Sequence, residues 1–119
     1  MAVEKDNLHN QKLGKNGEKE ACSYLKKNGW KILEKNYKTP FGEIDIIAKK
    51  DDTVAFIEVK TRLSDIFGLP SEAVTNVRKQ RYIRGANYYF TGKIINCTVR
   101  FDIIEVFQNQ INHIENAFY

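Results

Sequence analysis

Apolar and polar positions interleave in two neighbouring segments, Gly42–Ala48 and Val54–Arg62. Both segments are rich in β-branched and aromatic residues, which favours β-strands. The five residues between them, 49–53, are polar and predict a turn centred on Asp51 and Asp52. Two strands joined by so short a turn are expected to pair as an antiparallel hairpin.

A hairpin centred on this turn has a definite register. It pairs Lys50 with Thr53 and, continued along the strands, Asp45 with Glu58. Lys60 would then lie opposite Glu43, one step further along the same face. A two-residue or a four-residue loop gives this pairing, whereas a bulge or a loop of odd length would turn the side chains to the other face.

The two faces of this hairpin differ in polarity. One face is wholly apolar and would carry Ile44, Ile46, Ala48, Ala55, Ile57 and Val59. The other face carries the acids but also Ile47 and Phe56. A sheet that is apolar on both faces requires helices on both sides. The charges therefore gather at one end of a covered face, where a cleft would open.

Two segments have the spacing of helices. From about Lys12 to Asn28 one face collects Gly17, Ala21, Tyr24, Leu25 and Asn28, and Gly29 ends the segment. A second helix is predicted from Ser71, as N-cap, to about Phe90, with Gly92 after it. Because glycine costs a helix about 1 kcal/mol relative to alanine, Gly14 and Gly17 indicate a late start or a close approach to another backbone.

The remaining apolar segments complete an α/β fold. Strands are predicted at Trp30–Lys38, from about Asn96 to Phe107, and as a short edge strand at Ile111–Ile114. The order is helix, three strands, helix, strand and a final short strand, which predicts a mixed central sheet flanked by helices. We expect a single domain over residues 12–119 after a disordered tail, residues 1–11.

Composition limits the class of protein. The chain has 119 residues, 42% of them hydrophobic, which suits one globular domain. It has no apolar run long enough to span a membrane and no signal-peptide pattern, so the cytoplasm is the expected location. Cys22 and Cys97 lack the spacing of a zinc site and are expected to be small core residues. His9 and His113 are isolated, which disfavours a histidine metal site.

The positive charge is concentrated in two regions. The net charge is +4, a modest bias toward polyanionic partners. One basic region is the N-terminal third, with Lys12, Lys15, Lys19, Lys26, Lys27, Lys31, Lys35 and Lys38. The other is the second predicted helix, with Arg78, Lys79, Arg81 and Arg84. Solvated helix faces are the plain alternative for any single one of these side chains.

The two facing acids, Asp45 and Glu58, could together bind a divalent cation. At roughly 5 Å, two carboxylates repel by roughly 3 kcal/mol at an effective dielectric near 20. A divalent cation would relieve that repulsion, and Lys60 could position a water beside it. Glu18, at the edge of the buried face of the first helix, could hang over the same end of the sheet. The alternative is a surface lattice of weak ion pairs, with Glu43 paired to Lys60.

A set of short motifs follows the chain in order: Gly17-Glu18 with Ala21 and Leu25, Gly42-Glu43-Ile44-Asp45, Ile57-Glu58-Val59-Lys60-Thr61-Arg62, Phe67-Gly68 with Ala73-Val74, and Arg100-Phe101-Asp102. This combination, from about Gly14 to Val106, resembles the bacterial YraN-like family of predicted endonucleases. More distantly it resembles the PD-(D/E)xK superfamily, with its restriction-endonuclease-like αβββαβ core. Archaeal Holliday-junction resolvases have the nearest layout.

The resemblance assigns roles to particular residues. It implies a metal-binding aspartate at Asp45, a second acid at Glu58 and a catalytic lysine at Lys60, with Glu18 as a further acid from the first helix. Ile44 departs from the pattern, since many members have proline there, but that position often varies. The expected cofactor is Mg²⁺ or Mn²⁺, which prefer oxygen ligands.

The function implied is metal-dependent hydrolysis of phosphodiester bonds in DNA that is branched or single-stranded. Backbone phosphates would be gripped by Arg62, Arg78, Lys79, Arg81 and Arg84. Tyr82, Tyr88 and Tyr89 could stack on bases, although packing on the sheet is the expected use of at least two of them. A junction substrate would require a homodimer. Alternatives are a non-catalytic nucleic-acid-binding or scaffold protein on the same fold, or a protein-interaction domain.

Overall fold

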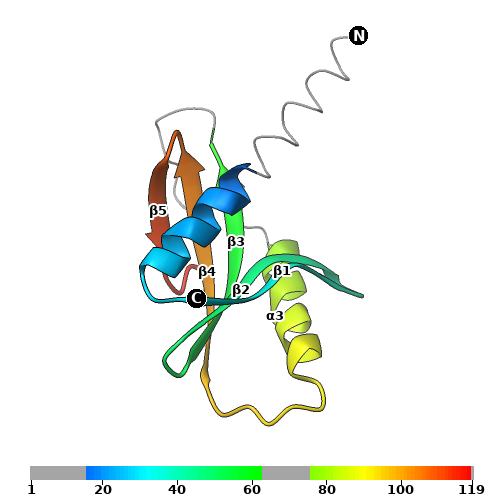
Figure 1. The fold of residues 1–119 in the computed structure, drawn as a ribbon. Helices are drawn as coiled ribbons and strands as arrows, with labels where there is room; N and C mark the ends of the chain where they lie inside the picture. Colours follow the sequence, from blue (N-terminus) through cyan, green and yellow to red (C-terminus); the bar gives the residue numbers. More distant parts are fainter. Residues whose placement is uncertain (1–15, 63–75, 119) are drawn as a thin grey trace.

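The computed structural model describes residues 16–62 and 76–118, which form a twisted five-stranded sheet with two helices (Figure 1). Residues 16–27 are helical and are called the first helix. The other elements are β1 (Lys31–Thr39), β2 (Gly42–Lys50), β3 (Thr53–Thr61), α3 (Asn76–Phe90), β4 (Thr98–Phe107) and β5 (Gln110–Ile114).

The sheet is mixed and its strands follow in the order β1-β2-β3-β4-β5. Strands β3 and β4 are parallel, and every other neighbouring pair is antiparallel. The predicted α/β fold with a mixed sheet flanked by helices is therefore confirmed, and the short edge strand is present as β5. The predicted helix starts at Lys12 and Ser71 lie outside the described residues, as do Gly14 and the tail.

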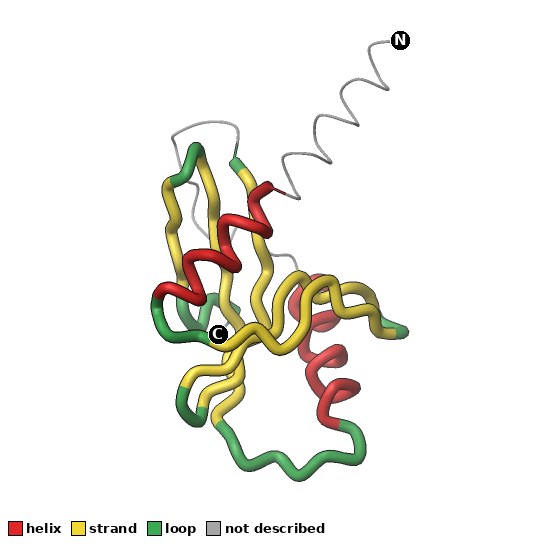
Figure 2. Tube along the Cα trace, viewed as in Figure 1, coloured by secondary structure: helices red, strands yellow, loops and turns green. Residues whose placement is uncertain are grey.

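The first helix and α3 cover different parts of the sheet (Figure 2). Ala21 and Leu25 of the first helix are fully buried against apolar residues of β2, β3 and β4. Tyr82 and Ala86 of α3 belong to a second cluster, which includes Phe56 and Phe101. Helices on both sides are what two apolar faces require, so the sequence pattern and the packing agree.

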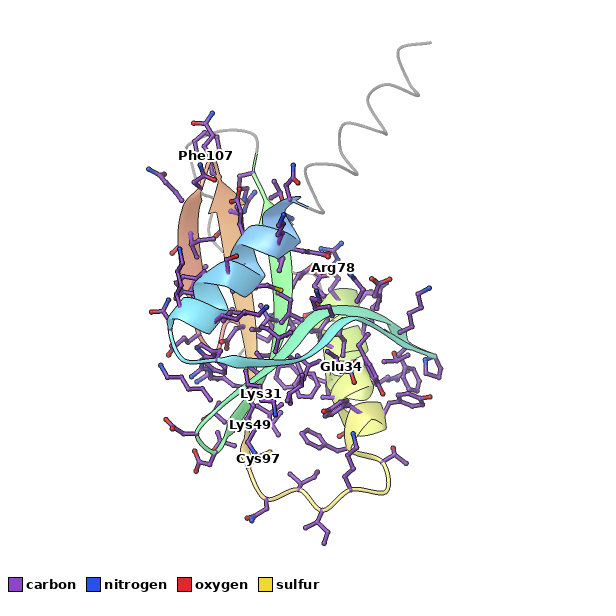
Figure 3. The ribbon with its side chains drawn as sticks, in the orientation of Figure 1. Lys31, Glu34, Lys49, Arg78, Cys97 and Phe107 are labelled. Carbon is purple, nitrogen blue, oxygen red and sulfur yellow. The ribbon has the colours of Figure 1, made fainter. Side chains whose placement is uncertain are left out.

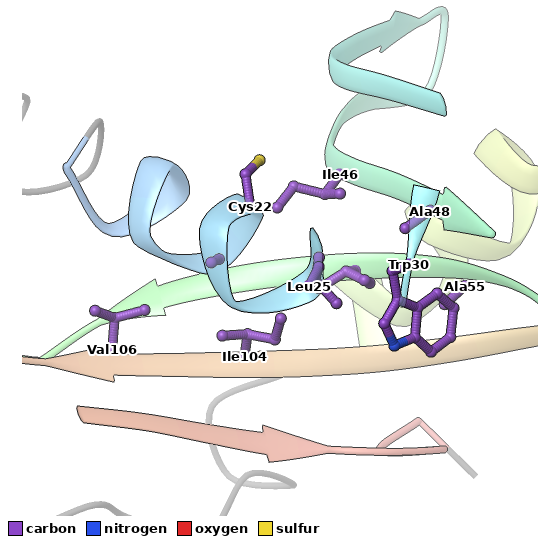
Figure 4. Packing of buried hydrophobic residues seen from close by; sticks show 10 residues of the cluster. Cys22, Leu25, Trp30, Ile46, Ala48, Ala55, Ile104 and Val106 are labelled. Atoms are coloured by element: carbon purple, nitrogen blue, oxygen red, sulfur yellow. The ribbon is translucent and has the colours of Figure 1, made fainter. Parts of the chain in front are cut away.

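Figure 4 shows the cluster beneath the first helix at close range. Cys22 and Leu25 of the helix share this cluster with Ile46, Ile104 and Val106 of the sheet. Trp30, which follows the helix, closes one end of this cluster. Cys22 is a buried free thiol and Cys97 a partly buried one. The prediction of small core residues holds for Cys22 and in part for Cys97.

The hairpin between β2 and β3 has the predicted register. Its turn contains only Asp51 and Asp52, and the pairs run from Lys50↔Thr53 to Ile46↔Ile57. Asp51 adopts a left-handed φ of 53°, a conformation that aspartate tolerates better than most residues because its side chain is short and polar. Of the two loop lengths considered, the structure has the shorter.

Beyond Ile46 the two strands of the hairpin separate. Strand β2 continues to pair with β1 as far as Thr39↔Gly42, whereas its ladder with β3 ends at Ile46↔Ile57. The far part of β1 and β2 thus forms a two-stranded arm that crosses over α3 (Figure 1). The predicted strand pairs of Asp45 with Glu58 and of Glu43 with Lys60 are therefore wrong, because β2 and β3 have already separated there and Glu43 pairs with Lys38 of β1 instead.

The arm changes the surroundings of Ile44. We predicted that Ile44 shares a face with Ile46 and Ala48, but Ile44 packs in the α3 cluster and the other two lie beneath the first helix. Its side chain lies so close to Gly85 that a Cβ there would be 2.8 Å from the Ile44 Cδ1. The prediction failed because it assumed a flat hairpin, whereas β2 bends away from β3 to follow α3.

A polar cluster joins both ends of the described chain to β4. The Asp102 carboxylate is fully buried and accepts hydrogen bonds from Arg100, from His113 Nε2 at 2.8 Å and from the Asn116 amide. His113 Nδ1 lies 3.0 Å from the Tyr24 hydroxyl of the first helix. These partners lower the pKa of Asp102 although its burial raises it, so the cluster is a satisfied buried network.

No helix within the described ranges is long and apolar enough to cross a membrane.

Candidate functional site

Asp45 stands where β2 leaves β3. Its Oδ2 accepts a hydrogen bond of 2.8 Å from the backbone N–H of Val59, so the side chain takes a donor that a continued ladder would have used. Burial raises the pKa of Asp45 to about 7, against the lowering effect of that hydrogen bond, and the nearby charges of Glu18, Glu58 and Glu43 raise it further. So high a pKa is unusual for an aspartate and marks Asp45 as a candidate cation-binding group.

Glu58 is the second acid of the site and is buried, with 6% of its surface exposed. Burial raises its pKa, and the positive charges of Arg78, Lys60 and Arg81 act in the opposite direction. The Arg78 guanidinium donates to Oε1 of Glu58. Oε2 is buried and has no hydrogen-bond partner among the described residues. Burying a carboxylate oxygen without a hydrogen-bond partner costs free energy, so this oxygen is a candidate contact for a bound ligand.

Tyr82 of α3 inserts its hydroxyl between the separated strands. The hydroxyl accepts from the Asp45 N–H at 3.4 Å and donates to the Ile57 carbonyl at 3.4 Å. Burial places the pKa of Tyr82 well above its usual value. It thus bridges two backbone groups that the parting of β2 and β3 would otherwise leave unpaired. Sequence reasoning considered base stacking for Tyr82 and missed this role.

Glu18 reaches the site from the first helix. Its pKa is raised by burial, lowered by a hydrogen bond from the Asn36 side chain, and raised by Glu43. Asn36 lies on β1 between the pairs Lys35↔Ile46 and Tyr37↔Ile44, and so opposite Asp45. Sequence reasoning also missed Asn36, whose φ of 50° is rare for a residue within a strand.

Lys60, on β3, and Arg62, directly after that strand, have different surroundings. Lys60 is partly buried, and its charge acts on Glu58. The Arg62 Nε donates to Oε2 of the fully buried Glu105 at 2.8 Å. Arg62 was expected to grip phosphate, yet it stands in a partly buried ion pair. Glu105, the register neighbour of Lys60 on β4, was not anticipated.

The basic residues of α3 point in several directions. Arg78, at the end of the helix nearest the first helix (Figure 3), contacts Glu58. Arg81 lies against Gly42 so closely that any Cβ there would overlap its side chain. The Arg84 guanidinium lies 5.8 Å from the centroid of the Phe41 ring.

The tyrosines of α3 differ in their exposure. Tyr89 packs on Phe56 and Tyr37, and Tyr82 is buried. This confirms sheet packing for Tyr82 and Tyr89, whereas Tyr88 is 44% exposed.

Comparison with known proteins identifies the family to which this chain belongs. Residues 17–106 match the family described as Uncharacterised protein family UPF0102. The chain belongs to the UPF0102 family. It is 51% identical over 107 residues to a UPF0102 protein of Thermodesulfovibrio yellowstonii, covering 90% of this chain and 96% of that one. This is the YraN-like family that the motifs predicted.

Two further UPF0102 proteins have a similar sequence identity to this chain. The chain is 49% identical over 116 residues to one from Clostridium acetobutylicum, covering 92% of this chain and 95% of that protein. It is 50% identical over 117 residues to one from Alkaliphilus oremlandii, covering 92% and 99%. Glu18, Asp45, Glu58 and Lys60 all fall within the residues matched by the UPF0102 family.

The acids of this UPF0102 chain fit a magnesium ion in part. Among the residues that the structure places, no three acidic, histidine or cysteine side chains converge closely enough to hold a metal by themselves. Mg²⁺, however, is commonly held by one or two carboxylates together with waters and phosphate oxygens. Asp45 and Oε2 of Glu58, which has no hydrogen-bond partner among the described residues, would be the two carboxylates of such a site. Glu18 acts on Asp45 through its charge and could contribute through water.

Proposed function

We propose that this UPF0102 protein is a metal-dependent nuclease that hydrolyses phosphodiester bonds in DNA. The observation that carries the proposal is the proximity of Asp45 and Glu58 where β2 leaves β3, with a carboxylate oxygen of Glu58 left without a hydrogen-bond partner and with Lys60 two residues further along β3. Two acids with raised pKa values are costly to the fold. Such a cost is typical of functional sites.

Each residue has a role that its surroundings support. Asp45 and Glu58 would bind Mg²⁺, which supplies Lewis-acid stabilisation of the phosphate and a more acidic bound water. Lys60 would orient or deprotonate the attacking water and stabilise charge on the phosphate. Glu18, held by Asn36, would contribute from the first helix. Arg78 would offer its guanidinium to the phosphate beside Glu58.

Cleavage assays test the proposal directly. Single-stranded, duplex and four-way-junction DNA are incubated with the protein and Mg²⁺ or Mn²⁺, beside Asp45→Ala and Lys60→Ala. The wild type should cut at least one substrate, and each variant should lose roughly 10²- to 10⁴-fold in rate because a positioned acid or base contributes that much. Asp52→Ala and Lys50→Ala, which remove exposed side chains of the same types at the turn, should cut normally.

Two outcomes would contradict parts of the proposal. Binding of all three substrates without cleavage of any would contradict nuclease activity. Cleavage undiminished in Asp45→Ala and Lys60→Ala would move the active site elsewhere. If the junction is the preferred substrate, two active sites are required, and the protein should sediment as a homodimer.

Two observations favour a second function. Arg78 already contacts Glu58, and the acids within the described ranges form no ready three-residue metal centre. A non-catalytic nucleic-acid-binding or scaffold protein on the same fold would need no more than that. It predicts metal-independent binding with no cleavage, which the same assays measure.

A further inference from the structure

We propose that the exposed side of α3 and the turn between β1 and β2 bind an unpaired DNA strand, with bases stacked on Phe41 and Tyr88. This inference rests on the proposed function, because it names the kind of DNA that would be led to Asp45. The surface, here called the Phe41–Tyr88 face, consists of Phe41, Asn76, Val77, Gln80, Arg81, Arg84, Asn87, Tyr88 and Thr91.

Two aromatic side chains are exposed on this face. Phe41 is 42% and Tyr88 44% exposed, and Val77, which borders one hollow together with Phe41, is 70% exposed. They border two open hollows that share Phe41 and Arg84. A folded domain usually covers large apolar groups, so a cluster of exposed ones marks a contact surface.

The positive charge of the Phe41–Tyr88 face favours a polyanionic ligand. Helix α3 contains Arg78, Lys79, Arg81 and Arg84 and no acidic residue, and among the described residues no acid borders either hollow. Arg84 lies over the Phe41 ring at 5.8 Å from its centroid. A base stacked on Phe41 would therefore have a cation next to it for the adjoining phosphate. Joining two copies through this face would bring two basic helices together.

The aromatic rings distinguish an unpaired strand from a duplex. In a duplex the flat faces of the bases are covered by their neighbours, and a protein meets phosphates and base edges. Exposed aromatic rings next to basic groups are the combination by which single strands are held, because every unpaired base offers a face for stacking. Phe41 and Tyr88 would gain little from a duplex backbone.

The face is continuous with the acidic site. Arg81 borders one hollow, packs along Gly42 of the arm, and acts through its charge on Glu58. Arg78, one helical turn before it, contacts Glu58 directly. A strand on Phe41 would thus have Arg81 and Arg78 for its next phosphates on the way to Asp45 and Glu58.

Binding measurements test the proposal without requiring cleavage. The anisotropy of a labelled oligothymidine of about 20 nucleotides and of a matched duplex is measured in chelator. Phe41→Ala and Tyr88→Ala should each weaken binding of the single strand about tenfold or more, because stacking on each ring is lost. Phe41→Tyr and Tyr88→Phe keep the rings and should retain binding. Duplex binding should change little in any variant.

Ile94→Ala is the matched control, because Ile94 is 94% exposed and does not border either hollow. It should bind like the wild type, and thermal melting checks that every variant is folded. Unchanged single-strand binding by Phe41→Ala/Tyr88→Ala would overturn the proposal. So would an equal loss for strand and duplex, or a wild-type dimer that this double variant dissociates, since the face would then join two copies.

The same variants keep this inference separate from the proposed nuclease activity. Single-strand binding that depends on Phe41 and Tyr88, without cleavage by the wild type in Mg²⁺, would support the face and contradict the nuclease. Metal-dependent cleavage that is insensitive to both rings on every substrate would support the nuclease and overturn the face.

Discussion

At the scale of single residues, Asp45 is held in surroundings that oppose its ionisation. Burial and three neighbouring acids raise its pKa to about 7, and the hydrogen bond from the Val59 N–H counteracts them. In the unfolded chain the pKa would be near 3.8. The folded state therefore favours the protonated form, and the contribution of Asp45 to stability is fully present below the unfolded value. It is lost as pH rises from about 4 through about 7.

This gives a prediction for Asp45→Asn in metal-free buffer. The amide is neutral, and its oxygen can still accept from Val59, so the variant should be more stable than the wild type at about pH 8. The gain is on the order of 4 kcal/mol as an upper bound, and it should vanish near pH 4. Urea unfolding across this range measures it.

Asp52→Asn is the control for Asp45→Asn, because it removes the same charge from an exposed turn. It should follow the wild type at every pH. If Asp45→Asn gained no stability at high pH, or if Asp52→Asn gained as much, the burial of a charged Asp45 would not be the cause.

At the scale of elements, the first helix packs closely against β3 because residue 17 is glycine. A Cβ on Gly17 would overlap the Thr61 Oγ1, whereas the Thr61 Cβ would stay 3.5 Å away. From the cost of glycine in a helix, the sequence predicted either a late helix start or a close approach to another backbone, and the close neighbour of Gly17 is instead a side chain. The sequence could not say that the neighbour would be a side chain at the end of β3, because that contact joins distant parts of the chain.

Gly17→Ala should therefore destabilise the protein by about 1 to 2 kcal/mol through overpacking. With Thr61→Ala present the obstacle is gone, and the same change should stabilise by up to about 1 kcal/mol, because alanine favours the helix. Denaturant unfolding of the four proteins in this cycle measures the reversal. Equal effects of Gly17→Ala in both backgrounds would show that Thr61 does not limit the approach.

The separation of β2 from β3 illustrates what local sequence can predict. The register followed from the turn at Asp51 and Asp52 because those residues are adjacent to both strands. The end of the ladder at Ile46 depends on Tyr82, which comes from α3 and bridges Asp45 to Ile57. The same distant helix accounts for the position of Ile44. The pairs from Lys50↔Thr53 to Ile46↔Ile57 were predictable, whereas the bend of β2 and the insertion of Tyr82 were not, and the pairs predicted beyond Ile46 are absent for that reason.

At the scale of the whole molecule, the acids of the site join two parts of the sheet. Asp45 belongs to the β1–β2 arm, and Glu58 belongs to the strands on the other side of the separation. The motifs predicted that Glu18, Asp45, Glu58 and Lys60 lie together, but no motif predicted the contact of Arg78 with Glu58 or the ion pair of Arg62 with Glu105. Such pairings depend on how the helices settle on the sheet.

A cation shared by Asp45 and Glu58 should stabilise the domain as a whole. At a Mg²⁺ concentration of about 100 times Kd, the free energy of unfolding should increase by about 2.7 kcal/mol. The increase should shrink below about pH 7, since protonated Asp45 cannot bind the ion. Thermal melting in Mg²⁺, against an equal ionic strength of KCl, measures it.

Asp45→Ala/Glu58→Ala should lose this stabilisation, whereas Asp51→Ala/Asp52→Ala, which removes two exposed acids from the turn, should keep it. No response of the wild type to Mg²⁺, or an equal loss in the control, would contradict a shared ion at the separation of β2 and β3.

The hydrogen bond from Val59 to Asp45 makes one amide proton a spectroscopic indicator of the site. The Val59 N–H donates to Oδ2 at 2.8 Å, and the resonance of such a proton follows the charge of its acceptor. In ¹H–¹⁵N spectra of metal-free protein, the Val59 signal should titrate with the carboxyl group of Asp45. Added Mg²⁺ should shift the same signal. A single backbone resonance would thus report protonation and ion binding separately, in the wild-type chain and without a substrate.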